Sequence, residues 1–206
     1  MDRGLKKWEL ALMFGVLCLL VFGGWVDWEQ QQLAGRVIRL HVIANSDSPQ
    51  DQALKLAVRD RVLARAETLY PAETSREEAL EILAAHLPEL AREGQTVVEE
   101  WGASQPVTAR LEECWFPTKE YEDFSLPAGE YTALRIVIGE GEGQNWWCVA
   151  FPPLCLGAAS QTVEQAAQAG SFTPGQAALM TGENGGYVLK FKSMELLGEL
   201  KGFFEK

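Results

Sequence analysis

The spacing of apolar and polar residues changes along the chain. Leu10 to Val26 is a run of seventeen residues without a charge. From about residue 54 to residue 101, apolar residues recur at three- and four-residue steps, which is typical of amphipathic helices; from residue 107 they alternate with polar ones, as in strands. Because the helices cluster before the strands, we predict one α+β domain whose helices pack on a mainly antiparallel or mixed sheet.

The N-terminal segment resembles an export signal. Arg3, Lys6 and Lys7 precede the apolar run, and a basic flank before an apolar run directs the following chain across a membrane. The run is longer than the core of most signal peptides and shorter than a full membrane span of about 20 residues. We therefore predict a cleaved signal peptide or an uncleaved anchor at 1–26, a polar spacer at 27–34 and an extracytoplasmic domain at 35–206.

A predicted strand at 35–44 runs into a helix through the sequence "NSDSP". Ser48 suits the N-cap, Pro49 the first helical position, and Asp51 the first turn. Further on, Ser75 and Glu78 have the spacing of a capping box, which predicts a second helix. A third, separate helix is predicted from Pro88 to Trp101.

The middle of the chain reads as strands. The alternation in 107–116 and in 130–151, with a glycine-rich turn inside the second segment, predicts a hairpin or meander. We expect Gly141 and Gly143 to supply positive φ angles in a hairpin loop. That loop precedes a strand and carries Glu140 and Glu142, which argues against a phosphate cradle. Calcium bound by the two glutamates is an alternative, although their spacing fits no EF-hand. Short helices are predicted at 162–180, a strand near 187–192 and a final helix at 194–204.

The net charge of the chain limits the classes of partner that it can bind. Without residues 1–26 the chain has 15 basic and 27 acidic residues, a net charge of −12, which disfavours nucleic acids and anionic lipid surfaces.

Cys114, Cys148 and Cys155 would lie outside the cytoplasm, so at most one intramolecular disulfide can form among them. Cys148–Cys155 is the preferred pair; free thiols and metal ligation are the alternatives. We predict no metal and no cofactor.

A hydrolase is the catalytic hypothesis. It would use His41 as the base, Ser46 or Ser48 as the nucleophile and Asp47 to orient the histidine. No G-x-S-x-G turn supports it, and capping already accounts for several of these residues. A partly buried structural role for His41 is the simpler interpretation, so no catalytic residue is predicted.

Adjacent tryptophans form the least ordinary feature. Trp146 and Trp147 would point to opposite faces of a strand. Either helices cover both faces of the sheet, or one tryptophan lies at an interface with a partner.

Two long segments, "RLHVIANSDSPQDQALKLAVRD" and "CWFPTKEYEDFSLPAGEYTALRIVIGEGEGQNWWCVAFPPLC", closely resemble the stage II sporulation protein R family of endospore-forming bacteria. The resemblance covers roughly residues 1–155. It implies a non-enzymatic protein, made in the forespore and exported to the intermembrane space. There it would activate a membrane-embedded aspartic protease of the mother cell, which cleaves the precursor of a sigma factor.

The resemblance supplies no catalytic residues. For a signalling protein that favours the protease's active state by differential affinity, we expect the contact surface to lie on exposed turns. The expected contacts are Asn45, Ser46, Asp47, Gly141, Glu142, Gly143, Asn145, Trp146 and Trp147.

Overall fold

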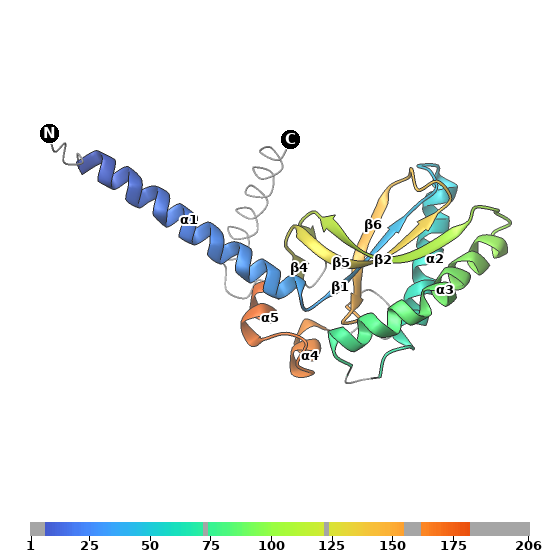
Figure 1. Ribbon diagram of the computed structural model, residues 1–206. Helices are drawn as coiled ribbons and strands as arrows, with labels where there is room; N and C mark the ends of the chain where they lie inside the picture. The colour runs from blue at the N-terminus through green and yellow to red at the C-terminus, as the bar shows by residue number, and fades with distance from the viewer. Residues whose placement is uncertain (1–6, 72–73, 122–123, 155–161, 182–206) are drawn as a thin grey trace.

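The computed structural model describes residues 7–71, 74–121, 124–154 and 162–181 (Figure 1). The α+β prediction is confirmed, since helices accompany a mixed four-stranded sheet of order β2-β5-β1-β6 and a two-stranded sheet of β3 and β4. The elements are α1 (Lys7–Ala34), β1 (Ile38–Ile43), α2 (Pro49–Glu67), α3 (Arg76–Glu100), β2 (Val107–Phe116), β3 (Lys119–Glu120), β4 (Ser125–Leu126), β5 (Gly129–Ile138), β6 (Asn145–Phe151), α4 (Val163–Gln168) and α5 (Pro174–Thr181).

The strand β1 lies inside the sheet. It pairs in parallel with β5 and antiparallel with β6, and β2 pairs antiparallel with β5 on the outside. The prediction of a hairpin or meander is confirmed for the antiparallel pair of β2 and β5 and was wrong for β5 and β6, because β1 separates them. An apolar strand such as β1, almost wholly buried, suits an inner position with both faces covered. The segment between β5 and β6 has hairpin-like composition but crosses over the end of β1.

The helices α2 and α3 lie side by side on one face of the sheet (Figure 1). In the register of the strands, Leu40 of β1 and Leu134 of β5 are direct neighbours on this face, and both are fully buried. Val58 of α2 and Leu90 of α3 are also fully buried in the same core. Burying this apolar area is the main favourable term in the fold.

Local capping signals predicted both helix starts correctly. The Ser48 side chain accepts a hydrogen bond from the Asp51 amide, and Ser75 forms a capping box with Glu78. The separate helix at Pro88 was a wrong prediction, because α3 continues through this proline. One buried stripe spans the whole helix and holds both halves on the core: Ala79, Leu83, Leu90, Gly94, Val97 and Val98.

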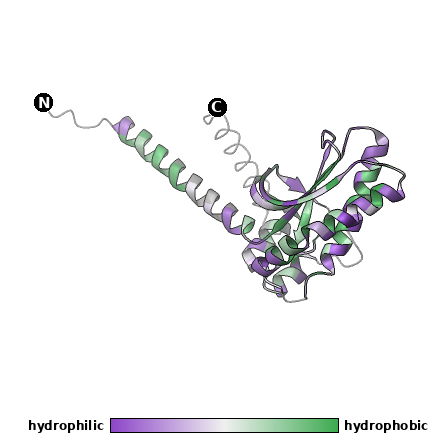
Figure 2. Cartoon of the chain, turned by 45° about the vertical axis from the view of Figure 1, so that its right-hand side comes forward, coloured by the Kyte–Doolittle hydropathy of each residue, from purple (hydrophilic) through white to green (hydrophobic). Residues whose placement is uncertain are grey.

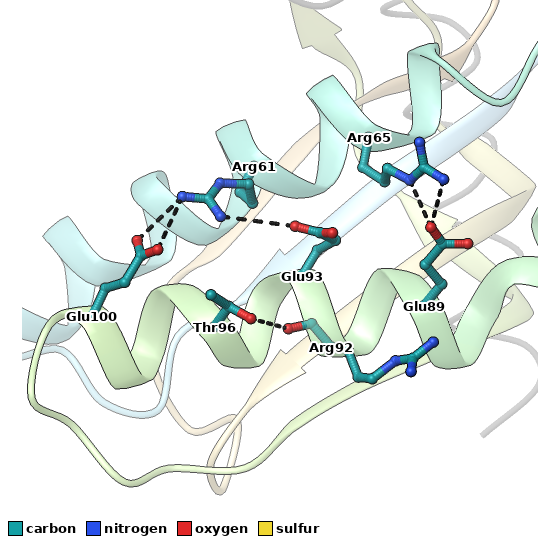
Figure 3. A network of polar contacts seen from close by, with 7 residues as sticks. All are labelled: Arg61, Arg65, Glu89, Arg92, Glu93, Thr96 and Glu100. Atoms are coloured by element: carbon teal, nitrogen blue, oxygen red, sulfur yellow. Dashed lines mark hydrogen bonds and ion pairs between the residues drawn. The ribbon is translucent and has the colours of Figure 1, made fainter.

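Ion pairs join the outer surfaces of α2 and α3 (Figure 3). Arg65 pairs with Glu89 at 2.5 Å, and Arg61 reaches Glu100 at 3.1 Å and Glu93 at 3.8 Å. All five side chains are partly exposed, so each pair contributes only about 0–1 kcal/mol. The buried apolar side chains of α2 and α3 contribute more to their packing than these ion pairs do.

The first helix extends away from the domain in Figure 1, and Figure 2 shows an apolar band along it. Its exposed apolar side chains run from Trp8 to Trp28, whereas Leu33 near its end is buried in the core. Residues 27–34, interpreted as a spacer, are thus helical; they form the end of α1 that packs on the domain. No helix in the described residues has both the length and the hydropathy of a membrane span. The signal or anchor role of 1–26 stays a prediction.

The short helices expected at 162–180 are confirmed as α4 and α5. The strand expected near 187–192 and the helix at 194–204 lie outside the described residues.

Candidate functional site

The turn from β1 to α2 is organised around the carboxylate of Asp51. Its Oδ2 accepts hydrogen bonds from the Asn45 amide at 2.9 Å and from the Ser46 hydroxyl at 2.5 Å, and its backbone amide donates to Ser48. These donors, Ser46 first and then Asn45, hold the pKa of Asp51 below its ordinary value, because they stabilise the charged form. Asp51 fixes the turn as well as serving the helix start.

The loop between β5 and β6 lies directly on this turn. The amides of Glu142 and Gly143 donate to the carbonyls of Asn45 and Ala44, at 3.2 and 2.9 Å. In the same direction, the Glu140 amide donates to the side-chain oxygen of Asn45 at 3.1 Å. The loop must pass here because it connects the two strands on either side of β1.

Two further contacts lock the loop in place. The Asp47 carboxylate accepts from the Gln144 amide at 2.8 Å. Lys55, a buried lysine of α2, donates to the Gln144 carbonyl at 3.0 Å and to the Gln52 side chain at 2.6 Å. Burial lowers the pKa of Lys55. We call residues 44–48 and 139–145 together the turn-loop unit.

The predicted contact residues are thus brought together, but several have internal partners. Asn45, Ser46 and Asp47 use their side chains to hold the turn-loop unit, so these side chains also have a structural role. Glu142 differs, since its side chain is exposed and makes no hydrogen bond or ion pair within the described part of the chain. It is the side chain of this set most available to a partner.

The structure requires glycine at different positions of the loop for different reasons. Gly141 has a φ of 68°, as expected, and Gly139 has a φ of 59°, which the sequence analysis missed. Gly143 was assigned a positive φ wrongly. A Cβ added there would lie 2.6 Å from the carbonyl carbon of Ser46, so glycine is needed for the close approach of loop to turn.

The residues of the hydrolase hypothesis do not meet. His41 Nε2 lies 2.8 Å from Asn145 Oδ1, and its ring stacks on Trp147 with centroids 5.9 Å apart. Ser46 instead donates to Asp51, and among the described contacts no hydrogen bond links His41 to Ser46, Asp47 or Ser48. Burial is the largest influence on His41 and lowers its pKa. The partly buried location predicted for His41 is confirmed.

The two tryptophans do point to opposite faces. Trp146 lies under Arg59 of α2, with the guanidinium 4.4 Å from the ring centroid, whereas Trp147 lies beside His41 and under Lys119 of β3. Both are partly buried. Elements on both faces of β6 therefore cover part of each ring.

Arg39 is a structural residue that the sequence analysis did not single out. Its side chain is fully buried between the rings of Phe116 and Tyr131, 4.3 and 4.9 Å from the guanidinium carbon. Nε donates to the Cys148 carbonyl at 3.1 Å, and Nη2 donates to the Tyr121 hydroxyl at 3.0 Å. The available signal was a basic residue within an apolar strand. Through its bond to Tyr121, which directly follows β3, Arg39 stabilises the packing of this segment on the sheet.

Cys148 is buried and disulfide-bonded, and Cys18 and Cys114 are free thiols. Cys155 lies outside the described residues, so the Cys148–Cys155 pairing stays a prediction. In the described residues no group of three or more His, Cys, Asp or Glu side chains could hold a metal ion.

Comparison with known proteins identifies the family. The model of the family described as Stage II sporulation protein R matches residues 34–161, a segment that contains the turn-loop unit, α2, α3 and the whole four-stranded sheet. The chain belongs to the stage II sporulation protein R family. The resemblance of the two long segments is confirmed.

A relative in this family is the Stage II sporulation protein R of Bacillus subtilis (strain 168). It is 45% identical over 121 residues, which are 59% of this chain and 54% of the relative. The alignment therefore spans about half the length of that protein. No solved structure matches the chain. Membership in this family supports a role in sporulation.

Proposed function

We propose that the chain is an exported signalling protein of endospore formation. It binds the extracytoplasmic part of a membrane-embedded aspartic protease of the mother cell and favours the protease's active state without performing catalysis itself. The family match over residues 34–161 carries this proposal. A ligand shifts a conformational equilibrium only by its differential affinity for the two states, so the function requires a well-defined contact surface.

The turn-loop unit supports such a surface. It is held by side-chain and backbone hydrogen bonds from β1, α2 and the β5–β6 loop. A contact surface that is already ordered loses little conformational entropy on binding. Glu140 and Glu142 project from it as exposed acids, which favours a complementary basic segment on the protease.

The N-terminal helix supports the proposed location. Its exposed apolar side chains and the preceding basic residues fit a segment that directs export, with the domain delivered to the intermembrane space. The protein acts there either as a secreted or as a membrane-anchored molecule.

Reconstitution tests the proposal. The full chain is exported from a non-sporulating cell that also contains the protease and the sigma-factor precursor, and precursor cleavage is followed. Glu142→Arg is expected to reduce cleavage strongly, because it reverses an exposed charge that has no partner among the residues the structure describes. Glu81→Arg, at an exposed acid on α3, is the matched control and should leave cleavage unchanged. Full cleavage with Glu142→Arg would remove the turn-loop unit from the contact surface.

The same assay separates an activator from a hydrolase. His41→Gln retains an amide that can bond Asn145 but removes the imidazole base. Cleavage that persists with this variant supports a non-catalytic activator. Loss of cleavage with a folded His41→Gln protein would favour a hydrolase that acts through His41.

A further inference from the structure

The strand β2 forms a long outer edge of the main sheet. It has ten residues and, among the strands that the structure describes, pairs only with β5. The opposite edge, β6, is shorter and its second half is buried. A long exposed edge strand presents unpaired backbone donors and acceptors that can pair with another strand.

The hydrogen-bond pattern identifies which β2 residues point outward. Pro106 accepts from the Gly139 amide at 2.8 Å, which makes this a hydrogen-bonded pair of the antiparallel ladder. Every second residue after Pro106 therefore directs its backbone groups toward β5, and the alternate residues direct theirs away. Four of the latter have no backbone partner within the described residues: Ala109, Leu111, Glu113 and Trp115. Val107, next to them, donates outward to Gln95 of α3.

The charged side chains of β2 are complementary to those of a second β2 strand that runs antiparallel to it. The side chain of Arg110 is exposed and makes no ion pair or hydrogen bond in the described part of the protein. Glu112 uses Oε1 to accept from Arg135, and its Oε2 has no such contact there. In an antiparallel pair of two identical strands centred on Leu111, Arg110 of each copy faces Glu112 of the other.

We propose that a second copy of this chain docks on β2, forming a twofold-symmetric dimer with one continuous sheet. Centring on Leu111 places two outward-pointing residues opposite each other, as hydrogen-bonded pairing requires. Both Arg110–Glu112 contacts then occupy non-hydrogen-bonded positions, where facing side chains approach most closely. The interface is isologous, so each favourable contact occurs twice.

The exposed tryptophan of β2 fits this register. Trp115 is 55% exposed, a large value for so large an apolar side chain. The dimer places it across from Val107 of the second copy, on the face that carries α3. Trp115 would then cover the end of the joined strands.

Cysteine cross-linking on the full chain tests the register. Thr108 of one copy faces Cys114 of the other in the proposed dimer, at a non-hydrogen-bonded position suited to a disulfide. In a Cys18→Ser background, Thr108→Cys should give a disulfide-linked dimer after copper-phenanthroline oxidation. The matched control, Ala109→Cys, points to the other face of the strand and should give little. Equal yields from both variants, or none from Thr108→Cys, would overturn the proposed register.

Charge reversal tests the contact independently. Arg110→Glu alone and Glu112→Arg alone each place like charges opposite one another at two positions, which should weaken dimerisation about tenfold or more. Mixing the two variants restores two opposite-charge contacts and should restore association. Sedimentation of the full chain in detergent micelles measures both effects, and circular dichroism verifies folding.

Other results would overturn the dimer. A monomeric wild-type chain would do so, as would a dimer insensitive to Arg110→Glu, which would then form through another surface. A monomer whose protease activation depends on Arg110 would assign the β2 edge to that partner instead. Because dimerisation is measured without the protease, its failure is distinguishable from failure of the proposed function.

Discussion

The side-chain amide of Asn45 donates to the carboxylate of Asp51 at 2.9 Å, across the turn that joins β1 to α2. Ser46 donates to the same oxygen. Replacing Asp51 by alanine removes both bonds and leaves two donors without their acceptor. We expect a loss of about 1–3 kcal/mol in the free energy of unfolding, measured by urea denaturation. Asp60→Ala, at an exposed site on α2, should cost much less.

The carboxylate of Asp51 should make the stability of the folded protein sensitive to acid. Its pKa lies below the ordinary value in the folded protein, so its stabilising effect is present above the unfolded pKa and is lost as pH falls through the folded pKa. Stability of the wild type should fall as pH drops below about 4. Asp51→Asn should show a shallower fall over this range, and parallel curves for the two proteins would contradict the assignment.

Protonation of His41 should affect the stability of the folded protein over a different pH range. Burial lowers its pKa, so the folded state disfavours the protonated ring. Stability should decline as pH falls from about 7 to 5. His41→Gln removes this titration and should decline less, and a decline equal to that of the wild type would contradict a lowered pKa of His41. The comparison uses denaturation at a series of pH values.

Gly143 should not tolerate a side chain. A Cβ there meets the Ser46 carbonyl group, which is backbone and can move only with the whole turn. Gly143→Ala is expected to cost about 1–3 kcal/mol. Gly175 has no heavy atom within 4 Å of an added Cβ, so Gly175→Ala is the control and should be nearly neutral. Equal thermal shifts would contradict the close approach.

Arg39 should be one of the more sensitive polar positions. Arg39→Ala leaves a cavity between Phe116 and Tyr131 and removes the bond to Tyr121, at an expected cost of about 2–5 kcal/mol. Arg39→Met keeps much of the volume and removes a buried charge, so it should cost less. Arg36→Ala, at an exposed site, is the control. A greater loss for Arg39→Met than for Arg39→Ala would contradict this account.

Local signals predicted much of the fold. Ser48 and Ser75 cap helices because capping depends on residues three positions apart, which a sequence displays directly. The pairing of β1 between β5 and β6 could not be predicted in this way, since it depends on packing between distant segments. The same applies to Arg39, because a charged residue in a strand ordinarily faces water and nothing local indicates that Tyr121 will cover it.

The candidate site was predicted in part for the same reason. Asn45, Asp47 and the glycine loop were selected together as turn residues, and the structure places them side by side. Their mutual hydrogen bonds were not predicted, because the loop was expected to close a hairpin. A loop that crosses another strand must bond to whatever lies beneath it, and here that is the turn after β1.

The inner position of β1 has a consequence for how the protein folds. Arg39 pairs with Ala133, 94 residues later, and with Val149, later still. Contacts this distant in sequence slow folding, because a long loop must close before they form. The most buried strand of the sheet therefore stays unpaired until β5 and β6 are available, and truncation before residue 151 should leave it exposed to aggregation.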